Sequence, residues 1–131
     1  MIVTTDSVTK PGDAAGKVLV AGSHAGIVSG WFAAQTGARA VILHDAGVGK
    51  DRAGVSGLDW LQSIGMAAAA VSHTSARIGD GADVLASGVI SHANALARDL
   101  GVAVGMACRD AAVHLTRATG PAGPVPDYRR R

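Results

Sequence analysis

The chain has 131 residues and a net charge of +2, enough length for one buried core and too little for two domains. Aromatic residues make up only 3% of it, so Ala, Val, Leu and Ile must build the core. Three of the twelve basic residues stand together at the end of the sequence, and no basic face is interleaved with aromatics, so we expect no nucleic-acid partner. No apolar run approaches the ~18 residues of a membrane span. The single cysteine, Cys108, excludes an internal disulfide, and we expect a soluble cytoplasmic protein with no membrane partner.

Apolar runs without polar alternation alternate with segments of helical length. Strands are expected at residues 1–5, 17–22, 38–45 and 66–73, with a last short strand at 102–105. Helices are expected at residues 24–37, 55–65, 82–88 and 106–118, the first two closing on glycines. Loops rich in glycine span residues 46–54 and 74–81.

The segment "GVISHANALARDLG", residues 88–101, allows two interpretations. Either residues 88–91 form a strand that leads into a helix, or Ser91 caps the helix "HANALARDL" directly. We favour the second. Whether Ser91 and His92 belong to a functional site or only begin a helix depends on this choice.

Strands that are apolar on both faces and alternate with helices are typical of a parallel sheet covered on both sides. We therefore expect an α/β fold: a small three-layer sandwich whose mostly parallel sheet has about four to five strands, with helices on both faces. Residues 1–118 would form the single domain. Residues 119–131 form a tail of Pro, Gly and Arg, which we expect to dock on a neighbouring subunit of a homo-oligomer.

Polar pairs end three of the predicted strands. Ser23-His24 follows "VLVAG", His44-Asp45 follows "AVIL", and Ser72-His73 follows "AAAAV". Because the carboxyl ends of parallel strands meet at one edge of a sheet, where ligands bind, we expect these pairs to line one site. For any single residue, capping a helix is the simpler explanation. For the three pairs together, a shared site explains the pattern better.

The candidate catalytic residues come from these pairs, and the candidate substrate-binding residues come mainly from the loops that follow. The catalytic candidates are Ser23, His24, His44, Asp45 and His73. The substrate-binding candidates are Lys50, Asp51, Ser72, Ser75, Arg77, Asp80 and His92.

A nucleophilic mechanism is the first chemistry that these residues suggest. Ser23 in "AGSHA" stands between a strand and a helix with small neighbours, as in a nucleophile elbow, although Ala21 and Ala25 replace the glycines of that motif. His73 or His44 would be the base, oriented by Asp45 or Asp80.

Two other chemistries remain open. His24, His44, Asp45, His73 and His92 could supply a three-ligand metal site, although no ligand spacing supports a divalent metal and no cofactor is identified. Lys50 and Arg77 could hold a small phosphate or carboxylate, whereas the fingerprints of standard nucleotide-binding loops are absent.

These observations predict a small cytoplasmic enzyme acting on a polar, anionic small molecule, a hydrolase of amide or ester type with a Ser/His/Asp site. The first alternative is a non-catalytic ligand-binding or assembly subunit that uses the same pocket. The second is a metal-dependent hydrolase or lyase. Catalysis requires an imidazole with a reacting partner, whereas a binding module would have its histidines bonded to backbone carbonyls.

Overall fold

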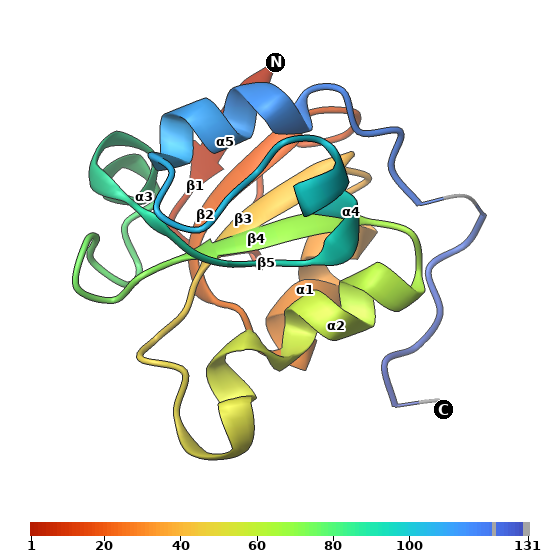
Figure 1. The fold of residues 1–131 in the computed structure, drawn as a ribbon. Helices are drawn as coiled ribbons and strands as arrows, with labels where there is room; N and C mark the ends of the chain where they lie inside the picture. Colours follow the sequence, from red (N-terminus) through yellow and green to blue (C-terminus); the bar gives the residue numbers. More distant parts are fainter. Residues whose placement is uncertain (122, 130–131) are drawn as a thin grey trace.

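The computed structural model of the chain describes residues 1–121 and 123–129, and only the backbone at Asp51. Its elements in chain order are β1 (Ile2–Thr5), β2 (Val18–His24), α1 (Ile27–Gln35), β3 (Ala40–His44), the 3₁₀ helix η1 (Lys50–Val55), α2 (Ser56–Ser63), β4 (Ala67–Val71), α3 (Gly81–Ser87), β5 (Ile90–Ala93), α4 (Ala95–Asp99) and α5 (Cys108–Leu115) (Figure 1).

One sheet of five strands runs in the order β1-β2-β3-β4-β5. The first four strands are parallel, and β5 pairs antiparallel with β4. The predicted α/β class with a mostly parallel sheet is confirmed. The inner strands β2, β3 and β4 have aliphatic runs without alternation, because both faces of the sheet are covered there.

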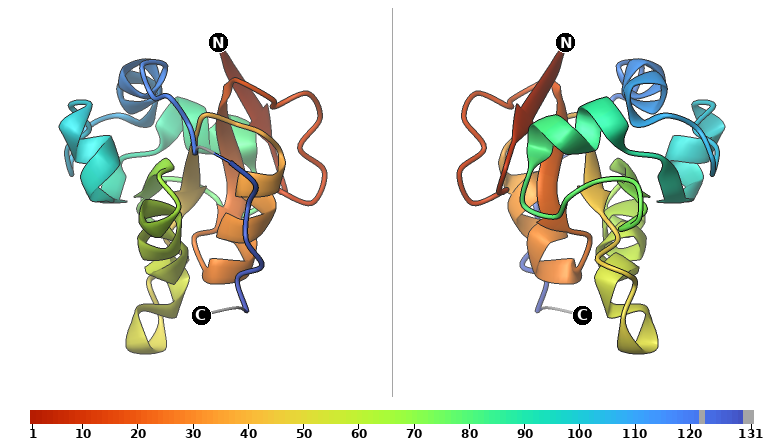
Figure 2. Two further views of the ribbon diagram at one scale, coloured as in Figure 1. Left: turned by 90° about the vertical axis from the view of Figure 1, so that its right-hand side faces the viewer. Right: turned by 90° about the vertical axis from the view of Figure 1, so that its left-hand side faces the viewer.

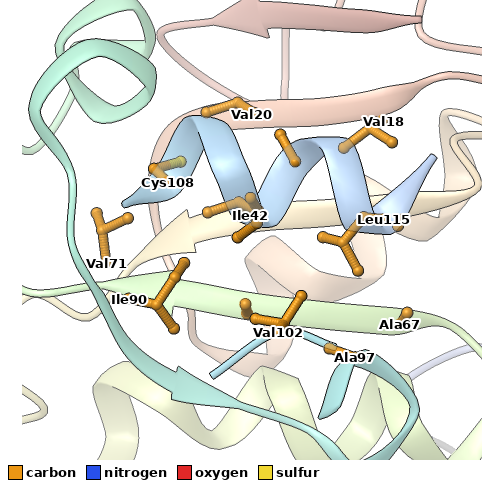
Figure 3. Packing of buried hydrophobic residues seen from close by; sticks show 14 of the residues in the cluster. Val18, Val20, Ile42, Ala67, Val71, Ile90, Ala97, Val102, Cys108 and Leu115 are labelled. Carbon is orange, nitrogen blue, oxygen red and sulfur yellow. The ribbon is translucent and has the colours of Figure 1, made fainter. Parts of the chain in front are cut away.

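Alternate residues of the strands feed two separate cores. Val18, Val20 and Ile42 face one side, where α3, α4 and α5 supply the covering residues, as the close view in Figure 3 shows for part of this cluster. Leu19, Val41 and their neighbours face the other side, under α1 and α2. The helices thus lie on both faces, which confirms the predicted three layers. Cys108 is buried in the first core, and burial raises the pKa of its thiol to about 12.

Small residues allow α1 and α2 to approach closely under the sheet. The peptide N–H of Gly57 donates to the carbonyl of Ala25 at 2.8 Å, and a Cβ at Gly57 would collide with the carbonyl oxygen of Gly26. The sequence therefore places glycine where two backbones touch, at the start of the helices that follow β2 and η1.

The structure corrects two predicted elements in the second half of the chain. Ser91 does not cap a helix: residues 90–93 form β5, and the N-cap of α4 is Asn94, whose Oδ1 accepts from the N–H of Ala97 at 3.0 Å. Residues 102–105 are not a strand, although a single antiparallel bridge joins Val89 to Ala107. The apolar residues of this stretch instead cover the core beside β5, where Val102 is buried.

The described part of the tail has no helix or strand and lies against its own chain, beside α1 (Figure 2). The ring of Tyr128 packs edge-on against Trp31 of α1, with the ring centroids 5.5 Å apart, and Val125 contacts the core under α1 and α2. Docking of the tail on a neighbouring subunit stays a prediction. Among the described residues, none of the helices has the length and apolar character needed to cross a membrane.

Candidate functional site

The carboxyl ends of β2, β3 and β4 lie side by side, as the parallel arrangement requires. His24 is the register partner of His44, and His44 is the partner of Val71 at the end of β4. The three predicted polar pairs therefore occupy one edge of the sheet. Their side chains, however, divide between two clefts and have different partners.

Asp45 directly follows β3 and accepts hydrogen bonds from several neighbouring segments. Its side chain is only 5% exposed, yet it accepts hydrogen bonds at both oxygens. The peptide N–H groups of Gly47 and His73 donate to Oδ1 at 2.8 and 3.0 Å, and the hydroxyl of Ser91 donates to Oδ2 at 2.8 Å. Burial raises the pKa of this carboxyl, but these hydrogen bonds outweigh burial and hold the pKa below the ordinary 3.8. Asp45 is therefore a fixed, ionised carboxylate.

His73 is the histidine that Asp45 orients. Its Nδ1 lies 3.3 Å from Oδ1 of Asp45, and its side chain is 56% exposed. Among the described residues, Nε2 of His73 has no hydrogen-bond partner. One ring nitrogen is thus held by a buried carboxylate while the other is open, which is the arrangement of a general base.

A β-bulge places Ser91 against Asp45. Ala70 and Val71 of β4 pair with His92 and Ile90 of β5, so Ser91 is an extra residue between them. A bulge turns a side chain away from its regular direction, and here the hydroxyl of Ser91 reaches Asp45. Nδ1 of His92 lies 3.0 Å from the oxygen of the same hydroxyl. Sequence reasoning did not assign Ser91 to the site, because it interpreted "VISHAN" as the start of a helix.

The loop after Asp45 has a left-handed backbone that few sequences tolerate. Ala46, Gly47, Val48 and Gly49 have φ values of 52°, 76°, 69° and 71°. Such a conformation is unusual for a β-branched residue like Val48, and strain of this kind tends to be retained at functional sites. In this loop the N–H of Ala46 donates to His44 and that of Gly47 donates to Asp45, so the strained turn holds both polar side chains.

His44 is bonded to the backbone at both ring nitrogens. Nδ1 accepts from the N–H of Ala46 at 2.9 Å, which leaves the proton on Nε2 to donate to the carbonyl oxygen of Ala76 at 2.8 Å. His44 as a whole is only 2% exposed. His44 lines the same cleft as His73, but its hydrogen bonds fasten the 74–78 loop to β3 and leave no nitrogen for a reaction.

Ser23 and His24 at the end of β2 bond to peptide N–H groups instead. Oγ of Ser23 accepts from the N–H of Val8 at 3.0 Å, and Nδ1 of His24 accepts from the N–H of Gly26 at 3.0 Å. In the described part of the chain, no imidazole lies within hydrogen-bond distance of Ser23. These two residues line a different cleft, with Asp6, Val28 and Phe32. The structure does not bring together the nucleophile and base that a Ser23 mechanism requires.

The cleft beside His73 has a volume of about 610 Å³. Its polar lining consists of His44, His73, Thr74, Ser75, Arg77 and Asp83. Asp83 accepts from the N–H of Arg77, which with the hydroxyl of Ser87 and the charge of Arg77 lowers the pKa of its carboxyl. The guanidinium of Arg77 is exposed at this cleft and supplies its positive charge.

Most of the remaining predicted substrate-binding residues form hydrogen bonds that hold the local backbone. Ser75 donates to the carbonyl of Ser72 and accepts from the N–H of Val89, so it joins two segments of the backbone. Ser72 contacts Thr74, and Asp80 is the N-cap of α3. Lys50 is exposed on η1 and does not line this cleft. The side chain of Asp51 lies outside the described residues.

Within residues 1–121 and 123–129, no three His, Cys or Asp side chains converge so that they could hold a metal ion. The predicted ligands His24, His44 and His73 point to separate partners, as described above. Comparisons of the chain with protein-family models, with curated proteins and with solved structures found no match.

Proposed function

We propose that this protein is a small enzyme in which His73, oriented by Asp45, acts as general base on a polar, anionic small molecule in the 610 Å³ cleft. The reaction type that fits best is hydrolysis of an amide or ester. The observation that carries the proposal is the single His73–Asp45 pair, with one ring nitrogen on a buried carboxylate and the other open at a cleft.

In this mechanism water is the nucleophile. Nε2 of His73 takes a proton from a bound water as the water oxygen forms a bond to the acyl carbon. The ionised carboxylate of Asp45 stabilises the imidazolium that results. The same proton then passes from Nε2 to the leaving nitrogen or oxygen as its bond to carbon breaks. Arg77 is the group that would bind an acidic substituent of the substrate.

This proposal replaces the Ser23 nucleophile of the sequence-based hypothesis with activated water. In a non-catalytic binding subunit we expect histidines that are bonded to the backbone, and His44 is bonded in this way at both ring nitrogens. His73 instead has a carboxylate at one ring nitrogen and no described partner at the other, and this arrangement favours catalysis. A cytoplasmic location and a homo-oligomeric assembly remain predictions.

The test is a screen of small amides and esters that carry a carboxylate, followed by kinetics of variants on any substrate found. His73→Ala should lower kcat by about 10³-fold, the size expected for loss of a general base. His24→Gln, a histidine of the other cleft, should leave kcat unchanged. Binding of the same compounds without turnover, or equal turnover by His73→Ala, would contradict the proposal and favour the binding subunit.

A further inference from the structure

A third cleft lies between β5, α2 and α4. Its volume is about 410 Å³ and it shares no lining residue with the His73 cleft. Its polar lining residues include Arg52, Asp59, Gln62, His92 and Arg98. The proposed hydrolytic reaction uses none of these side chains.

Positive charge is the first property of this cleft. Arg52 and Arg98 come from η1 and α4, and neither forms an ion pair with any described side chain. Arg98 donates through Nη1 to the carbonyl of Ala93 at 2.6 Å, which positions its guanidinium at the end of β5 and leaves its other N–H groups available. Asp59 is the one carboxylate among the described lining residues.

The neutral polar groups of the cleft have their acceptors occupied. Oε1 of Gln62 accepts from the N–H of Leu96 at 2.9 Å, and Oδ1 of Asn94 accepts from two peptide N–H groups. The amide nitrogen of Gln62 has no partner among the described residues. A pocket with two guanidinium groups outside any described ion pair and an open amide N–H, against the one carboxylate of Asp59, is suited to a ligand that offers acceptor oxygens.

His92 adds to the cleft an imidazole ring whose orientation is set by the protein. Because Ser91 donates its proton to Asp45, Nδ1 of His92 carries the proton that it shares with Oγ of Ser91 at 3.0 Å. Nε2 is then the ring nitrogen without a protein partner among the described residues.

We propose that this cleft is a second ligand site that binds a small dianion, a dicarboxylate or a phosphate, between Arg52 and Arg98, beside the ring of His92. Bidentate contacts of guanidinium groups with carboxylate or phosphate oxygens supply the affinity. The site is separate from the His73 cleft, so it stands even where the proposed hydrolysis fails.

The test is a titration of the full chain, labelled with ¹⁵N, with inorganic phosphate in one arm and malonate in the other, at constant pH and ionic strength. We expect saturable chemical-shift changes of the His92 ring and of the amides of residues 91–98. Saturation by both anions indicates recognition of the shared dianion, and saturation by one alone identifies phosphate or dicarboxylate as the ligand. No saturable change with either anion would overturn the proposal.

Variants locate the site. The side chain of Arg52 has no described hydrogen bond or ion pair, so Arg52→Gln loses no such contact within the protein. It should weaken anion binding by about tenfold. Arg98→Gln should do the same, with thermal unfolding measured alongside because it also loses the contact to Ala93. Arg77→Gln, in the other cleft, and Arg109→Gln, exposed on α5, are the matched controls. Unchanged affinity in Arg52→Gln and Arg98→Gln, or an equal loss in Arg77→Gln, would overturn the assignment.

Discussion

The ends of β2 and β4 carry the same dipeptide, Ser-His, and give it different partners. At β2, Ser23 and His24 bond to the peptide N–H groups of Val8 and Gly26, so Ser23 holds the β1–β2 connection and His24 the turn before α1. At β4, His73 reaches Asp45 of the neighbouring strand. The two pairs differ because their neighbouring strands differ. β4 lies between β3, which is followed by the carboxylate of Asp45, and β5, whose bulge brings the hydroxyl of Ser91 to that carboxylate.

A second contrast separates Ser91 and Asn94, which are three residues apart. Ser91 is in β5 and serves Asp45, whereas the side chain of Asn94 serves only the backbone. Asn94 accepts from the N–H groups of Ala68 and Ala97 and donates to the carbonyls of Leu58 and Met66. One buried amide therefore joins α2, β4 and α4. The polar residues of this short segment divide between site and scaffold.

The largest stability effect should follow removal of this scaffold residue. Asn94→Ala removes the four hydrogen bonds of a buried amide, to Leu58, Met66, Ala68 and Ala97, and with them the cap of α4, so we expect a loss of about 3 kcal/mol in the free energy of unfolding. Urea unfolding measures it. The control is Asp80→Ala, a cap on α3 with fewer side-chain bonds, for which about 1 kcal/mol is expected. Equal losses in the two variants would show that the additional hydrogen bonds of Asn94 contribute no stability beyond that of a helix cap.

The next effect tests whether Asp45 is an ionised carboxylate in the folded state. Asp45→Asn should cost about 2 kcal/mol at pH 7, because hydrogen bonds to a charged acceptor are replaced by weaker ones. The pKa of Asp45 is lowered on folding, so the stability it contributes is complete above its unfolded value near 3.8 and is lost as the pH falls through its folded value. The difference between wild type and Asp45→Asn should therefore shrink below about pH 4.

Urea unfolding of both proteins at pH 7, 5 and 3 checks this prediction. A difference that stays constant from pH 7 to 3 would show that the carboxylate is not stabilised by its four donor groups.

A smaller effect separates Ser91 from a helix cap. Ser91→Ala removes a hydrogen bond to a charged carboxylate and should cost about 1.5 kcal/mol. Because Asp45 orients His73, the variant should also lower kcat on any substrate found, whereas Asp80→Ala, a true cap, should not. Loss of stability with unchanged kcat would place Ser91 in the scaffold with Asn94.

The smallest effect is expected at the end of β2. Ser23→Ala removes the acceptor of the Val8 N–H in a partly buried hydrogen bond and should cost about 1 kcal/mol, with kcat unchanged. Thermal unfolding and the same kinetic assay measure both quantities. A large loss of activity with little loss of stability would restore Ser23 to the catalytic residues and remove the contrast between the two Ser-His pairs.

Local pattern was sufficient to predict the parallel half of the fold. Runs such as "VLVAG" and "AVIL" are apolar at every position, which indicates strands buried on both faces, and Gly37 and Gly65 adopt φ values of 79° and 85° just after α1 and α2. The same reasoning failed at β5. In "VISHAN" the local preference for a cap at Ser91 was outweighed by pairing with β4 and by the bond to Asp45, which is 46 residues away.

The sequence by itself determined that polar side chains end β2, β3 and β4 and that these ends share one edge, because parallel strands joined by helices must align their carboxyl ends. Only the tertiary structure decided which hydrogen-bond partners each of them has. His44 and His73 are alike in sequence context, yet one ring is bonded at both nitrogens to the backbone and the other meets a carboxylate. That choice depends on where the 74–78 loop and the β5 bulge pack, which no local pattern encodes.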